Sequence, residues 1–202
     1  MNQLDTLFAA RPTPEGFAGG YVEHLCGLLR GLDFAQVGRF VELLLAARQS
    51  GRRVFFLGNG GSAATASHFA NDIAIGTRCL DKPFRAISLT DNVAQITAIA
   101  NDDGYESVFT RQLGVLIEPG DVVVAISASG NSPNVVKAVE MARARGNTTV
   151  GLTGFDGGRL AETCDLVIHV RTAKGEYGPV EDVHMVLDHL IGAYLTRAAR
   201  EG

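Results

Sequence analysis

Histidine and carboxylate side chains recur at helical spacing in two separate parts of this sequence. His68 and Asp72 lie four residues apart in a segment with a helical pattern, so both side chains are expected on one helix face. A later helical segment carries His189 together with Glu181, about 80° away around the helix axis. Imidazoles and carboxylates in such positions bind zinc or transfer protons. These four side chains are therefore candidate metal ligands and acid–base groups.

The same residues also have structural interpretations. Glu181 and Asp182 follow Pro179 in the first turn of the last helical segment, where the helix dipole favours acids. Asp182 is only about 20° from His189 around that helix, whereas His184 points away from it. A His–Asp pair four residues apart is often a surface ion pair. Spacing alone does not separate these alternatives.

Two loops rich in glycine and serine are expected at strand ends, at 58–62 and 127–132. In the second loop, Ser132 suits a helix N-cap and Pro133 suits the first helical position. Three serine hydroxyls beside the start of a helix form a phosphate site that needs no lysine. The first loop lacks the Gly-Lys-Ser/Thr ending of nucleotide-binding loops and does not complete the dinucleotide fingerprint. Ordinary turns with a capped helix remain the alternative.

Short apolar runs alternate with helical patterns along most of the chain. The expected strands are 54–57, 84–89, 122–126, 148–152 and 166–170, and the expected helices between and after them are 62–75, 93–100, 133–145, 159–163 and 179–197. This alternation predicts an α/β fold with a parallel, doubly wound sheet. Ligands of such sheets bind at the carboxyl ends of the strands.

Two amphipathic helices are expected before the first strand, at 14–32 and 33–49, with Asp33 as a cap. We interpret 1–51 as a helical pair that belongs to the same domain as 52–202. Such helices pack as an antiparallel pair or form an oligomer surface.

Composition excludes several classes of protein. Of 202 residues, 46% are hydrophobic and 20% are charged, which permits a full core, and the net charge is -4. Scattered basic residues predict no nucleic-acid partner, and the lack of a long apolar run predicts no membrane span. Three widely spaced cysteines and no signal-like start favour the cytoplasm. His24 and His169 have no evident partner and are interpreted as structural.

Several ordered motifs resemble those of bacterial phosphoheptose isomerases, which are sugar isomerase (SIS) domain proteins. The matching segments are 58–63, 67–70, 127–132, 152–158 and 181–184, and Asp91 and 100–102 also fit. The resemblance covers nearly the whole chain. It implies a five-stranded parallel sheet flanked by helices, and a homotetramer with active sites between subunits. It also implies conversion of sedoheptulose 7-phosphate to D-glycero-D-manno-heptose 7-phosphate through an enediol, with zinc as the usual ion.

The resemblance assigns roles residue by residue. Serines would bind the phosphate, and Asn59 and Asp91 would contact sugar hydroxyls. The implied substrate-binding set is Asn59, Gly60, Gly61, Ser62, Asp91, Asn101, Asp102, Ser127, Ala128, Ser129, Ser132 and Glu181.

The family's metal and catalytic set is His, Glu, Gln and His, which falls on His68, Asp72, Glu181 and His189 here. Two of the four therefore differ: Asp72 is one methylene shorter than glutamate, and Glu181 adds a charge. We expect His189 to act as the base and Asp72 as the acid, with all four as zinc ligands. A basic residue that follows the His68 helix in the family is displaced in this sequence, with Arg78 the nearest candidate.

Two other functions remain open. A non-catalytic SIS group acts as a tetrameric scaffold on the replication initiator, and it resembles the chain at 90–92 and 97–102. The presence of both His68 and His189 argues against that role, while Asp72 and Glu181 leave it open. An isomerase for another sugar phosphate is the third hypothesis.

Overall fold

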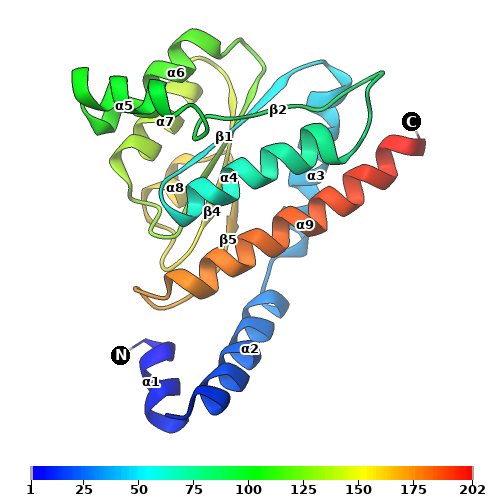
Figure 1. Cartoon of the computed structure of the whole chain (residues 1–202). Helices are drawn as coiled ribbons and strands as arrows, with labels where there is room; N and C mark the ends of the chain where they lie inside the picture. Colours follow the sequence, from blue (N-terminus) through cyan, green and yellow to red (C-terminus); the bar gives the residue numbers. More distant parts are fainter. Residues whose placement is uncertain (1, 202) are drawn as a thin grey trace.

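Five short strands form one fully parallel sheet at the centre of the computed structural model, which describes residues 2–201 (Figure 1). The strands are β1 (Arg53–Gly58), β2 (Arg85–Ser88), β3 (Val122–Ser127), β4 (Thr148–Thr153) and β5 (Leu166–His169). Their order is β2-β1-β3-β4-β5, with every neighbouring pair parallel. The predicted five-stranded α/β fold is confirmed, and each strand lies within two residues of its expected bounds.

The sheet has an apolar core on each face. Successive side chains of a strand point to opposite faces, so Val54 and Phe56 belong to one core while Phe55 and Leu57 belong to the other. The solid apolar strands of the sequence follow from this burial on both sides.

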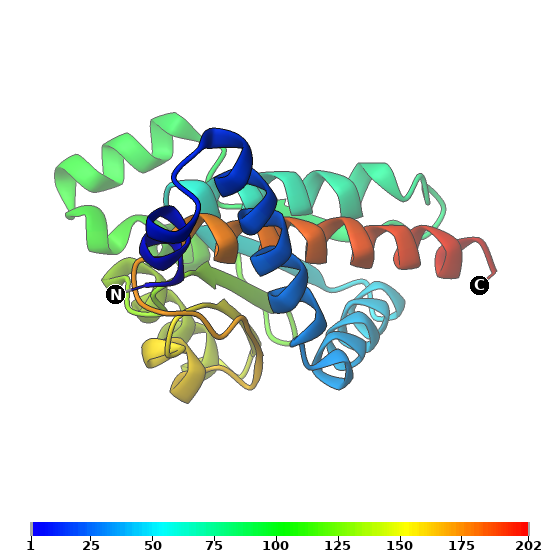
Figure 2. The same cartoon turned by 90° about the horizontal axis from the view of Figure 1, so that it is seen from below.

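Helices cover both faces of the sheet (Figures 1 and 2). They are α1 (Gln3–Ala10), α2 (Pro14–Arg30), α3 (Phe34–Gln49), α4 (Gly61–Asn71), α5 (Val93–Asp102), α6 (Val108–Leu116), α7 (Pro133–Ala144), α8 (Gly158–Thr163) and α9 (Tyr177–Glu201). Side chains of α3, α4 and α9 fill the first core, and those of α6, α7 and α8 fill the second. Helices α4 and α9 lie side by side, which brings their polar residues together (Figure 1).

The two helices expected before the sheet do not stack on each other along their length. Helix α3 buries Phe40 and Leu44 against the sheet, and Asp33 caps it as expected. Helix α2 buries only Gly20 and contacts α1 and α9 instead (Figure 2). The expected antiparallel pair is therefore not formed: α3 lies on the sheet, whereas α2 lies beside α1 and α9 and packs its partly buried Leu25, Leu28 and Leu29 against the first core.

Three helical segments fall outside the sequence-based expectations. Asn2 and Asp5 form a capping box that begins α1, a second missed helix is α6, and a short 3₁₀ turn spans Tyr105–Ser107. Helix α4 also changes to a π-helical turn at Asp72–Gly76, where a regular helix was expected. No helix among residues 2–201 combines the length and apolar character of a membrane span.

Candidate functional site

Three serine hydroxyls converge where β3 meets α7. Ser127 is the last residue of β3, and its Oγ lies 3.5 Å from Ser129 Oγ and 3.4 Å from Ser132 Oγ. Ser132 occupies the N-cap position of α7 as expected, but its side chain makes no capping hydrogen bond. All three hydroxyls therefore point toward one another beside the positive end of a helix, which suits a phosphate group.

A second glycine-rich loop fixes the backbone of this serine loop. The amides of Gly154 and Leu160 donate hydrogen bonds to the carbonyl oxygens of Ala128 and Gly130, each at 3.0 Å. Gly130 has φ +63°, and a Cβ on it would lie 2.0 Å from the carbonyl oxygen of Gly157. The two loops can approach this closely only because glycine has no side chain. The motif at 152–158 thus holds the serine loop in place.

The serine loop opens into a small cavity of about 160 Å³ at the carboxyl ends of β1 and β3. Its lining residues are Asn59, Ser62, Ile126, Ser127, Ala128, Ser129, Ser132, Tyr177 and Glu181. Seven of these belong to the substrate-binding set expected from the sequence, so the structure brings most of that set together. Tyr177 was missed because it lies before the expected start of the last helix.

A network of amides positions Asn59 at this cavity. Its side chain exchanges two hydrogen bonds of 2.9 Å with Asn134, and the Tyr105 hydroxyl donates to Asn59 Oδ1 at 2.9 Å. Gly60, with φ +56°, makes the sharp turn from this residue into α4. Sequence reasoning did not select Tyr105, since it lies 46 positions away in a segment without a motif.

The carboxylate of Glu181 lies over the start of α4. A Cβ on Gly61 would fall 2.2–2.5 Å from the Glu181 carboxyl group, so this approach also depends on glycine. Burial, and then the neighbouring Asp182 carboxylate, raises the pKa of Glu181. Asp182 accepts a 2.6 Å hydrogen bond from the Tyr21 hydroxyl, which ties α2 to α9.

Five expected substrate contacts are not among the lining residues: Gly60 and Gly61 form the turn into α4, and Asp91, Asn101 and Asp102 lie elsewhere. Asp91 follows β2, where its Oδ1 accepts hydrogen bonds from Ser88 and Thr90 at 3.3 and 3.2 Å. Asn101 and Asp102 are exposed at the end of α5, where the Asn101 amide donates to Asp102. Their substrate roles stay predictions.

A second polar cluster lies where α4 packs against α9. His68 Nε2 is 3.3 Å from His189 Nε2 and 3.5 Å from Asp72 Oδ2. A third carboxylate, that of Asp188, lies 3.9 Å from His68 Nε2. One ligand atom from each of the four residues lies within 4.8 Å of all the others. Glu181, the expected fourth ligand, is not part of this group.

The cluster has the dimensions of a transition-metal site. A nitrogen and a carboxylate oxygen bound to one tetrahedral zinc at about 2.0–2.2 Å lie roughly 3.3–3.5 Å apart. The 3.5 Å between His68 Nε2 and Asp72 Oδ2 falls at this separation. Nitrogen and carboxylate donors at these distances fit zinc or a similar divalent cation.

Asp188 and His184 are the most deeply buried ionisable groups of α9, and both are fully buried. Burial lowers the pKa of His184 to about 4, so it is neutral at pH 7. Burial also raises the pKa of Asp188 to about 7, with a further increase from Asp72 that His189 partly opposes. His184 points into the core and away from His189, as expected.

The remaining histidines have local partners. His24 Nε2 lies 3.0 Å from the buried Glu176 carboxylate, and His169 Nε2 lies 3.1 Å from the Phe155 carbonyl oxygen. Neither lies in the two clusters described above, which agrees with their interpretation as structural.

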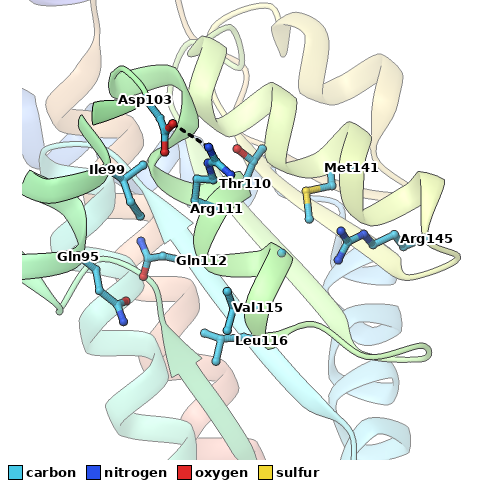
Figure 3. A pocket seen from close by; sticks show the side chains of 11 residues that line it. Gln95, Ile99, Asp103, Thr110, Arg111, Gln112, Val115, Leu116, Met141 and Arg145 are labelled. Atoms are coloured by element: carbon cyan, nitrogen blue, oxygen red, sulfur yellow. Dashed lines mark hydrogen bonds and ion pairs between the residues drawn. The ribbon is translucent and has the colours of Figure 1, made fainter. Parts of the chain in front are cut away.

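A larger hollow, with a volume of about 840 Å³, lies elsewhere, between α5, α6 and α7 (Figure 3). Its walls include Val115, Leu116 and Met141. The Arg111 guanidinium in this hollow is already paired with Asp103 at 2.7 Å. No histidine lines this hollow, so it lacks the combination of imidazole and carboxylate groups found in the α4–α9 cluster. Its greater volume alone does not identify it as the reactive site.

Known proteins match this chain along most of its length. The SIS domain family model matches residues 21–154. A phosphoheptose isomerase of Trichlorobacter lovleyi is 42% identical over 157 residues, which cover 76% of this chain and 80% of that protein. A phosphoheptose isomerase of Rhodospirillum rubrum is 41% identical over 149 residues, covering 74% of this chain and 78% of that protein.

Solved structures agree with these sequence matches. The phosphoheptose isomerase GmhA of Neisseria gonorrhoeae superposes with a TM-score of 0.79 at 31% identity, covering 90% of this chain and 97% of that one. A phosphoheptose isomerase of Francisella tularensis gives a TM-score of 0.80 at 25% identity, covering 92% and 99%.

Proposed function

Because the chain belongs to the phosphoheptose isomerase family of SIS-domain proteins, we propose that it converts sedoheptulose 7-phosphate to D-glycero-D-manno-heptose 7-phosphate. The observation that carries this proposal is the placement of two different clusters along one pair of helices. The serine loop lies at the start of α4 and α9, and the His68–His189 pair lies farther along both.

The separation of the two clusters suits a long sugar phosphate. His68 lies six residues beyond Ser62 on α4, a rise of about 9 Å, and His189 lies eight residues beyond Glu181 on α9, about 12 Å. Sedoheptulose 7-phosphate carries its phosphate at the opposite end from the carbons that react. The serine loop can therefore hold the phosphate while C1 and C2 reach the histidines.

The reaction moves one hydrogen from C1 to C2. We assign His189 the base role: its imidazole removes a proton from C1 and later returns one to C2 of the enediol. The Asp72 carboxyl group moves the other proton between the oxygens on C1 and C2. A bound divalent cation, zinc by family resemblance, supplies Lewis-acid stabilisation of the enediolate. His68 and Asp72 are within reach to hold it.

Nε2 of His189 cannot bind a cation and accept a proton at the same time. The base role therefore requires that other side chains hold the cation. Catalytic zinc sites commonly use three protein ligands and leave a fourth position for water or substrate. His68 and Asp72 supply two of those three.

A homotetramer with sites between subunits, in the cytoplasm, is part of the proposal. Apolar side chains remain exposed on the outer side of α3 and α9, where Phe34 is 61% exposed and Leu190 is 43% exposed. They line a shallow apolar hollow with Leu29 and Val186. Static light scattering of the purified protein tests this assembly, and a monomer at micromolar concentration contradicts it.

The function is tested by incubating the zinc-loaded protein with sedoheptulose 7-phosphate and following aldose formation. His189→Ala should lower turnover by at least about 100-fold while zinc content stays near one per chain. Arg197→Ala, an exposed change two turns farther along α9, is the matched control and should leave turnover unchanged. Binding of the sugar phosphate without turnover by the unmodified protein would favour a non-catalytic role. Turnover only with another sugar phosphate would change the substrate and keep the reaction class.

A further inference from the structure

Asp188 is a buried carboxylate that neither the sequence motifs nor the reaction described above accounts for. Its side chain has no exposed surface, although the next residue of α9, His189, is exposed. Neither of its carboxylate oxygens has a hydrogen-bond partner among residues 2–201. Buried carboxylates are normally paired with a donor or bound to a metal, because desolvation of an unpaired charge costs several kcal/mol.

The surroundings of Asp188 point to a cation. Its Oδ2 lies 3.9 Å from His68 Nε2, and its carboxylate belongs to the four-residue group with His68, Asp72 and His189. A second carboxylate in that group, Asp72, makes the pair of acids mutually repulsive without a positive charge between them. Two carboxylates and a neutral imidazole match the charge of a divalent cation and present oxygen and nitrogen donors that first-row transition metals accept.

Glu181, at the position of a family ligand, serves a different part of the site. Its carboxylate lies against Gly61 and lines the cavity of the serine loop. It also lies seven residues before Asp188 on the same helix, a rise of about 10 Å. One carboxylate therefore faces the phosphate end of the site and the other faces the histidines.

We propose that Asp188 is the third protein ligand of the cation, beside His68 and Asp72, and that Glu181 contacts the sugar phosphate instead. This inference rests on the proposed function for the presence of a cation. The new claim is which side chains bind that cation. The chain thereby moves one ligand from Glu181, near the start of α9, to the residue before His189.

The test compares metal affinity in the full-length protein and its variants. Zinc affinity is measured by competition with a chromophoric chelator, and the visible spectrum of the Co²⁺ form reports the ligand set. Asp188→Asn should weaken zinc binding at least about 10-fold and change the Co²⁺ spectrum. Glu181→Gln, the matched control, should keep zinc affinity within about threefold and leave the spectrum unchanged.

Three results overturn the inference: unchanged zinc affinity in Asp188→Asn, loss of affinity in Glu181→Gln alone, or no zinc binding by the unmodified protein. Asp188→Leu separates metal loss from unfolding, because an apolar side chain in this buried position should leave the metal-free fold at least as stable. Turnover of sedoheptulose 7-phosphate is measured separately on the unmodified protein. Metal binding that depends on Asp188 without turnover would contradict the proposed function and still support this inference.

Discussion

The serine loop and the α4–α9 cluster, the two parts of the proposed site, are built in opposite ways. The serine loop is held by backbone hydrogen bonds and by glycines that permit close approach of two loops. The α9 side instead buries ionisable groups without partners. Among residues 2–201, four of the seven buried side-chain atoms that lack a hydrogen bond belong to His184 and Asp188. The serine hydroxyls are therefore positioned by the fold itself. The α4–α9 cluster instead contains ionisable groups whose burial lowers the stability of the protein but which can take part in binding or catalysis.

The largest expected effect comes from disturbing the backbone of the serine loop. Gly130→Ala should destabilise the protein by at least about 3 kcal/mol, because it adds a clash to an unfavourable φ of +63°. Gly146→Ala is the matched control: Gly146 has φ +76° but no atom within 4 Å of its added Cβ. It should cost only about 1–2 kcal/mol. Urea unfolding of both variants measures the difference, and equal costs would contradict the close approach of the loops.

The buried His184 should make stability depend on pH. Its pKa in the folded protein is about 4, below the ordinary value of 6.5, so the unfolded chain takes up this proton first as the pH falls. Its contribution is complete above about pH 6.5 and is lost toward pH 4, by an amount on the order of 3 kcal/mol. His184→Met should therefore lose less stability than the unmodified protein between pH 7.5 and pH 4. Parallel curves for the two proteins would show that His184 is not buried in its neutral form.

At the phosphate end, loss of one serine hydroxyl should weaken binding and leave the chemistry intact. Ser127→Ala should raise the Kd for sedoheptulose 7-phosphate roughly 10- to 100-fold, since a hydrogen bond to a charged group contributes about 1.5–3 kcal/mol. Turnover at saturating substrate should change little. Ser50→Ala, whose hydroxyl bonds only to the Ala46 carbonyl at the end of α3, is the control. A fall in kcat with unchanged Kd would place the serines at the reacting carbons instead.

At the cation end, removal of a buried charge should stabilise the metal-free protein. Asp188→Leu should raise its unfolding free energy by about 1–3 kcal/mol, because two unpartnered oxygens disappear from the core. Asp72→Leu should bring no such gain, since the Asp72 side chain is 30% exposed and its charge is hydrated. Thermal unfolding in excess chelator measures both. Destabilisation by Asp188→Leu would show that Asp188 has a structural partner in solution.

The sequence predicted the sheet and the serine-rich turn after β3 well, for identifiable reasons. Strands such as β3 are apolar because both of their faces are buried. The serine and glycine residues occur where the chain turns after a strand. The cation end was predicted only in part. His68, Asp72 and His189 converge as the helical spacing indicated, whereas Glu181 does not join them.

Asp188 could not be found from the sequence, because its burial depends on how α9 packs against α4. In the sequence it is one more acid in an amphipathic helix. Tyr105 was missed for a related reason: its hydroxyl reaches Asn59 only after the chain has folded back across the sheet. Local patterns predict elements and turns, but contacts between distant elements require the structure.

The most direct test of the central claim follows the reaction in D₂O by NMR. The zinc-loaded protein is supplied with sedoheptulose 7-phosphate at a concentration that measurably raises its Tm, which establishes binding. An enediol mechanism with His189 as the base predicts formation of the aldose 7-phosphate with solvent deuterium at C2. Bound substrate that yields neither aldose nor deuterium incorporation would contradict the proposed function.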